Sequence, residues 1–223
     1  MKIKKALNHY FTYPDNVKVH LPWSPTGLGD AIDWPEEVLK LFNYSPGSGR
    51  NLYIYQYFQN LKKQSIKSID YLEVGTFIGS SVIDIYKFST LFDINVNITV
   101  VDTFEGTTNE DMSGFMSHWD ETNKFKNKFL ENLKENNITN VNIYEGYSDD
   151  FFKTNKKTYD LIYIDADHSY EAVVRDINNS LQILNKNGKL TGDDYHPIWG
   201  VFNAVNSFAN RFNVNIIGEM WYI

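Results

Sequence analysis

The sequence predicts an α/β fold, with a mostly parallel sheet of about seven strands, helices on both faces and an antiparallel hairpin at its C-terminal end. Short apolar runs of the kind found in buried strands alternate along the chain with longer runs whose apolar residues recur at helical spacing. Residues 159–194 contain a complete strand–helix–strand unit, which places two parallel strands side by side. Two final apolar runs, 214–217 and 220–223, are separated by Gly218-Glu219, which is typical of a tight turn.

The composition of the chain limits the classes of protein to which it can belong. At 223 residues it is long enough for one domain with a substantial core. A net charge of −7 and a pI near 5.2 argue against a nucleic-acid partner. The absence of cysteine excludes disulfides, thiolate catalysis and cysteine-bound zinc. Asn8 and His9 interrupt the apolar run that a signal peptide would need, and no apolar run reaches membrane-spanning length. We therefore expect a cytoplasmic protein without a membrane partner.

Residues 1–50 differ from the rest, because they hold five of the six prolines together with interleaved aromatic residues. We expect an irregular N-terminal arm with one short helix over Pro35–Phe42, since proline suits the first turn of a helix. Ser45–Gly49 is interpreted as a plain loop, because it lacks the lysine and the preceding strand of a phosphate-binding loop. The arm could pack on the domain of residues 51–223, on a second subunit or over an active site, and the sequence does not choose between these.

The elements of the main domain follow in order. Strands are predicted where short apolar runs are bounded by polar or turn residues: 69–74, 96–101, 141–144, 161–164, the run that ends at Asp193-Asp194, 214–217 and 220–223. Helices are predicted where apolar residues recur every three to four positions: 50–64, 80–88, 120–136, 149–153, 170–184 and 199–212. The polar connection 103–119 is long, and connections of this length are usually functional or mobile.

A glycine turn joins the 69–74 strand to the helix that follows it. It reads Glu73-x-Gly75-x-x-x-Gly79, and Asp102 ends the next strand. Glycine lets a ligand contact the backbone, and an acidic residue at this strand end can hold ribose hydroxyls, so the turn predicts a nucleoside site. A dinucleotide fingerprint needs a second glycine two residues on, and Glu73 beside a pyrophosphate would be unfavourable. S-adenosylmethionine, cationic and phosphate-free, fits better; the alternative is a turn needed only for tight helix–strand packing.

Three carboxylates, Asp165, Asp193 and Asp194, follow two strands predicted to be parallel neighbours. The carboxyl ends of such strands lie at the same sheet edge, where open α/β sheets bind ligands. Carboxylates crowded in this way repel one another unless a cation or proton lies among them. Oxygen ligands favour a hard divalent ion, magnesium first, with calcium or manganese as alternatives. The simpler interpretation is helix capping together with solvated acidic residues.

The motifs LEVGTFIGSS, VVDTFEG, YEGYS, YDLIYIDADHSYEAVVRDI and GDDY resemble those of class I S-adenosylmethionine-dependent methyltransferases. Within this class, the chain is most similar to the macrocin-type O-methyltransferases, which are metal-dependent and act on sugar hydroxyls. The resemblance covers about Tyr71–Tyr195 and implies a Rossmann-like domain. It also implies that Asp165, Asp193 and Asp194 ligate magnesium. The cofactor-binding residues that it implies are Glu73, Gly75, Thr76, Gly79, Ser81, Asp102, Thr103, Gly146, Ser148 and Asp165.

The resemblance assigns regions of the cofactor to parts of the chain. Gly75 would lie against the methionine portion, Asp102 would bind the ribose, and residues 146–148 would lie near the adenine. The candidate bases for removing the acceptor proton are His168 and Asp167, of which histidine has the better unperturbed pKa. The simpler interpretations are a solvated histidine that opens a helix and an aspartate that caps it. Four aromatic residues could line an acceptor pocket or only cover apolar surface: His118, Trp119, His196 and Trp199.

The leading hypothesis is a magnesium-dependent O-methyltransferase acting on a small hydroxylated acceptor, a sugar or nucleotide sugar, in a chain that could form a homodimer. Catechol-type relatives have lysine at the position of His168 and Asp-Asn in place of Asp193-Asp194, which weakens that alternative. A related hydroxylase component and a binding module without turnover also remain open. A nicotinamide-dependent sugar oxidoreductase of the short-chain type is disfavoured, because the chain has no Tyr-x-x-x-Lys pair.

Overall fold

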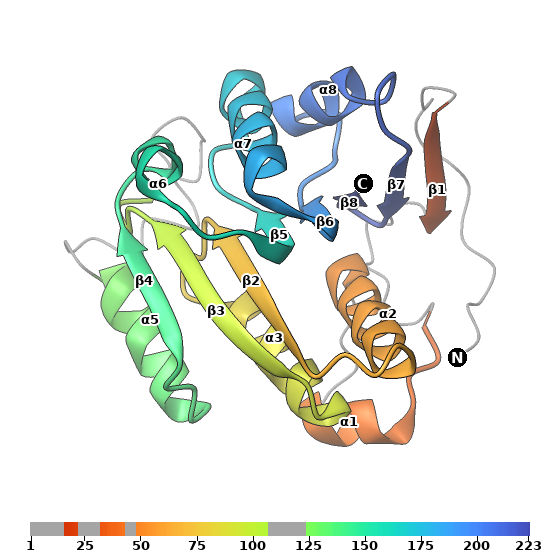
Figure 1. Cartoon of the computed structure of the whole chain (residues 1–223), viewed down its shortest axis with the longest axis vertical. Coiled ribbons are helices and arrows are strands. Elements are labelled where there is room, and N and C mark those ends of the chain that lie inside the picture. Colours follow the sequence, from red (N-terminus) through yellow and green to blue (C-terminus); the bar gives the residue numbers. More distant parts are fainter. Residues whose placement is uncertain (1–15, 22–31, 43–47, 107–123) are drawn as a thin grey trace.

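The computed structural model describes residues 16–21, 32–42, 48–106 and 124–223, and it shows one sheet between two layers of helices (Figure 1). The described strands are β1 Val17–Leu21, β2 Ser68–Val74, β3 Asn95–Asp102, β4 Val141–Glu145, β5 Tyr159–Ile164, β6 Leu184–Gly192, β7 Val214–Ile217 and β8 Met220–Tyr222. The described helices are α1 Glu36–Phe42, α2 Gly49–Lys63, α3 Ser80–Phe92, α5 Lys124–Glu135, α6 Ser148–Thr154, α7 Tyr170–Ile183 and α8 Gly200–Ser207.

The eight strands have the order β1-β7-β8-β6-β5-β2-β3-β4. β8 is antiparallel to both β6 and β7, and every other pair is parallel. The predicted α/β fold and its C-terminal hairpin are therefore confirmed. Because β2, β3, β4, β5 and β6 run in one direction, their carboxyl ends meet at one edge of the sheet, as open α/β sheets require for a ligand site.

Two apolar layers hold the helices on the sheet. One lies under α1, α2, α3 and α5 and contains fully buried rings such as Phe58, Phe88 and Phe129. The other lies under α6, α7 and α8 and is centred on Ile162, Leu190 and similar strand residues. Successive residues of a strand point to opposite faces of the sheet. The continuous burial of residues 71–74, 98–101 and 161–164 thus follows from helices on both faces of the sheet.

The N-terminal region contributes more regular structure than expected. Val17–Leu21 forms β1, which pairs in parallel with β7 at the edge of the sheet, so the expectation of an arm with only one short helix is wrong here. The residues VKVHL alternate apolar and polar as a strand does, and Val17 is buried while Lys18 and His20 are exposed. The short helix is confirmed as α1. Ile32 and Trp34 are also buried in the core.

Some element ends differ from the predictions. α3 extends to Phe92 instead of residue 88, and α8 ends at Ser207 instead of residue 212. α7 ends at Ile183, and β6 begins at once at Leu184, which leaves no loop between them. Ser48 caps α2, because its hydroxyl accepts a hydrogen bond from the Asn51 amide. Residues 45–47, 107–119 and 120–123 of the predicted loops and helix lie outside the described residues.

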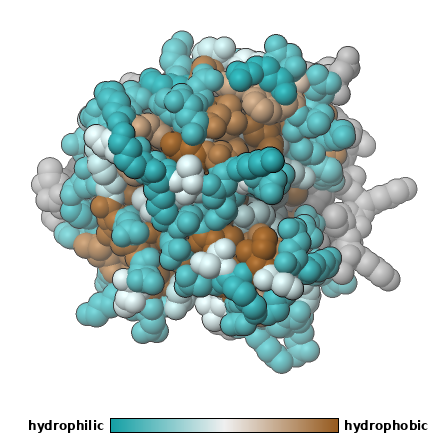
Figure 2. Space-filling model, viewed as in Figure 1, coloured by the Kyte–Doolittle hydropathy of each residue, from teal (hydrophilic) through white to brown (hydrophobic). Residues whose placement is uncertain are grey.

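Polar side chains cover most of the face shown in Figure 2, and the apolar side chains gather in separate patches between them. Among the residues that the structure describes, no helix has the length and apolar character that crossing a membrane requires.

Candidate functional site

A pocket of about 470 Å³ lies at the carboxyl edge of the sheet, where β2, β3, β4 and β5 end. Its walls contain eight of the residues that the sequence singles out: Gly75, Asp102, Thr103, Gly146, Ser148, Asp165, Asp167 and His168. Four other predicted cofactor residues are absent from the described lining of this pocket: Glu73, Thr76, Gly79 and Ser81. The predicted site residues therefore divide into a group that faces the pocket and a group that lies behind it.

The glycine turn after β2 needs its glycines for backbone reasons. Gly75 and Gly79 both have φ of +84°, a conformation that side-chain-bearing residues rarely adopt. A Cβ atom on Gly75 would lie 2.1 Å from the backbone oxygen of Asp165, and one on Gly79 would lie 2.6 Å from the Phe129 ring. Gly75 thus allows the ends of β2 and β5 to approach closely, which brings Asp165 to the turn.

Glu73 supports the turn from inside the protein. Its side chain is fully buried, and its two carboxylate oxygens accept hydrogen bonds from the Ser81 hydroxyl at 2.6 Å and the Tyr71 hydroxyl at 2.5 Å. Burial raises the pKa of Glu73 to about 7, although both hydrogen bonds favour the charged form. Thr76 is also buried. These residues can hold the shape of the turn, while contact with a ligand falls to the pocket-lining group.

Asp102, at the end of β3, forms hydrogen bonds with the loop that follows β2 and with the loop that follows β3. Its Oδ2 atom accepts hydrogen bonds from the backbone amides of Thr76 at 2.6 Å and Phe77 at 2.8 Å, and its Oδ1 atom accepts one from the Phe104 amide at 2.7 Å. The carboxylate lies in the pocket wall beside Thr103. A carboxylate has about four acceptor sites, so it can also accept a hydrogen bond from a ligand hydroxyl.

The pocket lining also contains Asp176, a partner of Ser148 that the sequence analysis missed. The Ser148 hydroxyl donates to Asp176 Oδ1 at 2.7 Å, and Asp176 is buried on α7. Burial raises the pKa of Asp176 to about 6. The available signal was an acidic residue on the apolar face of α7, next to Val173 and Ile177. Such a residue needs a partner, and here Ser148 is that partner.

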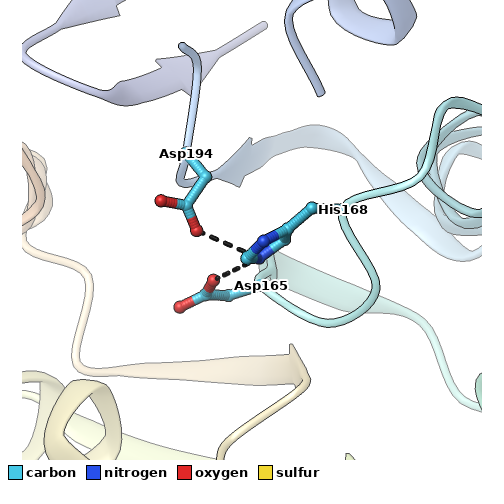
Figure 3. Close-up of side chains that lie close together, drawn as sticks. All are labelled: Asp165, His168 and Asp194. Carbon is cyan, nitrogen blue, oxygen red and sulfur yellow. Dashed lines mark ion pairs between the residues drawn. The ribbon is translucent and has the colours of Figure 1, made fainter. Parts of the chain in front are cut away.

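Asp194 adjoins the side of the pocket lined by Asp165 and His168, and the three side chains lie close together (Figure 3). His168 Nε2 lies 3.0 Å from Asp194 Oδ2 and 3.7 Å from Asp165 Oδ1. One ligand atom from each residue lies within 4.8 Å of the other two. Asp194 has φ of +56°, a strained conformation for a residue other than glycine, and such strain clusters at functional sites. Carboxylate oxygens with one imidazole nitrogen suit a hard divalent cation such as Mg²⁺ or Mn²⁺, so this group fits the predicted metal.

Asp193 stands outside this group of three but next to Asp165, because the Tyr163 hydroxyl, 3.4 Å from Asp165 Oδ2, also contacts Asp193. Its Oδ2 atom accepts a hydrogen bond from the Tyr163 hydroxyl at 2.8 Å and lies 3.9 Å from Arg50 Nη1. Burial raises the pKa of Asp193 to about 6, and the charge of Asp165 acts in the same direction, while Arg50 opposes both. The sequence places all three aspartates at one edge, but it does not show which way each side chain points.

Arg50 is the second residue that the sequence analysis missed. It lies in the first turn of α2 with its side chain 17% exposed, and its Nη2 atom is 3.0 Å from Asp84 Oδ2 on α3. Both residues belong to helices with apolar faces, where a charged residue normally faces solvent. A buried aspartate such as Asp84 requires a cation or donors, and α2 supplies one.

The candidate bases lie in the loop between β5 and α7. Asp167 lines the pocket, and its Oδ1 atom accepts a hydrogen bond from the Ser169 amide at 2.7 Å, a capping role that the sequence analysis had considered. The ring of Trp199 lies 5.4 Å from the ring of His168, so this predicted acceptor residue is adjacent to the cluster. The His196 ring accepts from the Ile198 amide at 3.4 Å. His118 and Trp119 lie outside the described residues.

Residues 72–195, more than half of the chain, match a family described as a methyltransferase domain. The solved O-methyltransferase NovP superposes with a TM-score of 0.62 at 18% identity, over 79% of each chain. CalS11, a calicheamicin methyltransferase, gives 0.60 at 14% identity over 88% of each chain. An O-methyltransferase from Bacillus cereus in complex with SAH gives 0.54 at 14% identity, over 90% of this chain and 97% of that one.

A curated relative, protein R132 of Acanthamoeba polyphaga mimivirus, is 33% identical over 93 residues. That match covers 35% of this chain and 42% of the relative, so the chain spans less than half the length of this relative. The structural likenesses, all at low identity, show the Rossmann-like methyltransferase fold.

Proposed function

The chain belongs to the methyltransferase-domain family, and from this premise we propose that it transfers a methyl group from S-adenosylmethionine to a hydroxyl of a small molecule with the help of a divalent cation. One observation carries this proposal. A single pocket joins the glycine turn and Asp102, which suit a nucleoside, to Asp165 and His168, which belong to the group suited to a hard cation.

The pocket would orient the methyl donor along its length. Gly75 allows the amino-acid portion to approach the backbone, Asp102 accepts hydrogen bonds from the ribose hydroxyls, and Ser148 lies on the wall proposed for the adenine. The negative charges of Asp102 and Asp165 suit a cationic sulfonium and would repel a pyrophosphate. These placements favour an adenosyl sulfonium over a dinucleotide.

A cation held by Asp165 and Asp194 would supply Lewis-acid chemistry, lowering the pKa of an acceptor hydroxyl. His168 would take the hydroxyl proton, and the two carboxylates beside its Nε2 atom would stabilise the imidazolium that forms. The acceptor oxygen then bonds to the sulfonium methyl as the carbon–sulfur bond breaks, and S-adenosylhomocysteine leaves. If the imidazole is itself a ligand of the cation, Asp167 in the same pocket wall is the alternative base.

We propose a sugar or nucleotide sugar as the acceptor class, on the strength of the resemblance to macrocin-type enzymes, and a homodimer as the assembly. Vicinal sugar hydroxyls can chelate a hard cation, which fits the acidic end of the pocket. A catechol would present two hydroxyls in a similar way, so both classes belong in the same screen.

The test is a methyl-transfer screen over nucleotide sugars, free glycosides and catechols, with mass detection of the methylated product. Each reaction is run with Mg²⁺ and with EDTA. We expect a product about 14 mass units heavier than one acceptor class, because a methyl replaces a hydrogen, formed with Mg²⁺ and lost with EDTA. Methylation at equal rate in EDTA would contradict the metal-dependent mechanism. Reduction or oxidation of the acceptor by a nicotinamide in place of methylation would contradict the proposed reaction.

A further inference from the structure

We infer that Arg50 competes with the cation for Asp193: Arg50 and the Tyr163 hydroxyl engage the Asp193 carboxylate beside Asp165, and a divalent ion gains Asp193 as a ligand only by displacing the Arg50 contact. This inference rests on the proposed function, because it assumes a cation at that group. Arg50 also lies outside residues 72–195, so the competition would come from a helix that precedes the matched domain.

The backbone of Arg50 is held in place by its neighbours. Gly49 begins α2 so close to the end of β7 that a Cβ atom there would lie 1.7 Å from the backbone oxygen of Ile217. Ser48 caps the same turn. The side chain has little freedom either, because Asp84 pairs with Nη2 at 3.0 Å. The guanidinium therefore stays beside Asp193 without depending on Asp193 to hold it there.

The contacts of Arg50 with its two aspartates differ in strength. A charge-assisted hydrogen bond between nitrogen and oxygen is about 2.7–2.9 Å long. The contact with Asp84, at 3.0 Å, is close to that range, while the contact with Asp193, at 3.9 Å, is purely electrostatic. A cation that bonds directly to the Asp193 carboxylate can replace the weaker contact and leave the stronger one intact.

The charges around Arg50 favour such an exchange. Its guanidinium lies 3.0 Å from Asp84 Oδ2 and 3.9 Å from Asp193 Oδ2. Arg50 therefore compensates part of the negative charge that would otherwise attract a divalent cation. Removing its charge should strengthen the attraction, and releasing Asp193 should add a ligand.

A purely structural counterion predicts a different result. In that case, replacing Arg50 would lower stability and leave cation affinity unchanged or weaker, since the site would lose its shape. A through-space charge effect predicts tighter binding that does not depend on Asp193. The exchange proposed here predicts tighter binding that does depend on it, and a double-mutant cycle separates the three.

The experiment measures Mn²⁺ affinity of the full chain by calorimetry and by the electron paramagnetic resonance signal of free Mn²⁺. The variants are Arg50→Gln, Asp193→Asn and the double variant, with Arg211→Gln as the matched control. We expect Arg50→Gln to bind Mn²⁺ about tenfold more tightly, and at least half of the gain in binding free energy to disappear when Asp193→Asn is also present. Equal or weaker binding by Arg50→Gln would overturn the inference, as would a gain that survives unchanged in the double variant.

Tyr163→Phe keeps the test decisive if Arg50→Gln does not fold. This variant preserves the buried ring and removes the hydroxyl that donates to Asp193 and lies 3.4 Å from Asp165. We expect it to bind Mn²⁺ about threefold more tightly, and unchanged or weaker binding would contradict the inference. Wild-type protein that binds no Mn²⁺ would overturn both this inference and the proposed metal dependence. Wild-type binding without any gain in the variants would overturn the inference alone.

Discussion

The two ends of the proposed site satisfy their carboxylates in different ways. At the glycine turn, Glu73 and Asp102 accept hydrogen bonds from hydroxyl and amide donors of the same chain. At the acidic end, the carboxylates of Asp165 and Asp194 face each other across His168. The first end is preorganised by the protein alone, whereas the second needs a positive charge to complete it. Cofactor binding and metal dependence should therefore be separable by mutation.

Gly75→Ala should break the preorganised end most severely. The new Cβ atom would lie 2.1 Å from a backbone oxygen at a φ of +84°, so we expect a loss of about 3 kcal/mol or more in the free energy of unfolding, and loss of S-adenosylmethionine binding. Denaturant unfolding measures the first and calorimetry the second.

Gly79→Ala is the matched comparison, because Gly79 has the same φ but a Cβ there would meet a side chain, the Phe129 ring, and not the backbone. We expect a smaller loss there. An equal loss in the two variants would show that the contact with Asp165 contributes nothing beyond the strained backbone angle.

Asp194→Asn should separate the two ends. Asparagine tolerates the left-handed conformation of this position but removes one negative charge from the proposed cation site. We expect turnover to fall by about 100-fold while the dissociation constant of S-adenosylmethionine changes by less than about threefold. Steady-state kinetics and calorimetry measure the two quantities.

The control for Asp194→Asn is Asp150→Asn, which alters a surface aspartate paired with Lys153. It should leave both quantities unchanged. Undiminished turnover in Asp194→Asn would show that the acidic end does not bind a metal needed for the reaction. Asp193→Asn should abolish methyl transfer and leave cofactor binding largely intact.

Glu73 makes the preorganised end sensitive to pH. Its pKa rises from an ordinary 4.5 to about 7 in the folded protein, so the unfolded chain releases this proton at a lower pH than the folded chain does. The free energy of unfolding therefore falls as the pH rises from about 4.5 to about 7, by at most about 3 kcal/mol. Glu73→Gln should flatten this decline in urea unfolding measured across that range. An unchanged pH profile would show that Glu73 is not protonated in the folded state.

Ser148→Ala should have the smallest effect. It removes the hydroxyl that donates to buried Asp176, so we expect a loss of about 1 kcal/mol in the free energy of unfolding and a modest weakening of cofactor binding. Ser207→Ala, which removes a hydroxyl bonded to the Ala204 carbonyl oxygen on α8, is the control for stability and should not affect the cofactor. Equal cofactor affinity in both variants would show that Ser148 does not contribute to binding the adenine.

The sequence predicted the parts of the molecule that depend on local patterns. Short apolar runs that alternate along the chain with helical runs identified the parallel sheet. Gly75 and Gly79 marked a turn that requires positive φ angles, which glycine adopts readily. β1 was missed because prolines on both sides masked a five-residue strand whose apolar alternation is short. Contacts between distant segments could not be predicted in the same way.

Arg50 illustrates that limit. It lies 34 residues from Asp84 along the chain, and neither helix reveals which face of the other it meets. Asp193 contacts Arg50 and Tyr163, so the sequence could place this carboxylate at the correct sheet edge without showing that it stands outside the group of Asp165, His168 and Asp194.

The central claim is that one end of the pocket binds the cofactor without help and the other requires a cation. The most direct measurement is calorimetric titration with S-adenosylmethionine, S-adenosylhomocysteine and NAD, each in EDTA and in Mg²⁺. We predict that both adenosyl compounds bind in EDTA with affinities within about threefold of those in Mg²⁺, and that NAD does not bind, because Gly75 and Asp102 are already in place. Failure of both adenosyl compounds to bind in either buffer would contradict the account and leave the glycine turn as architecture alone.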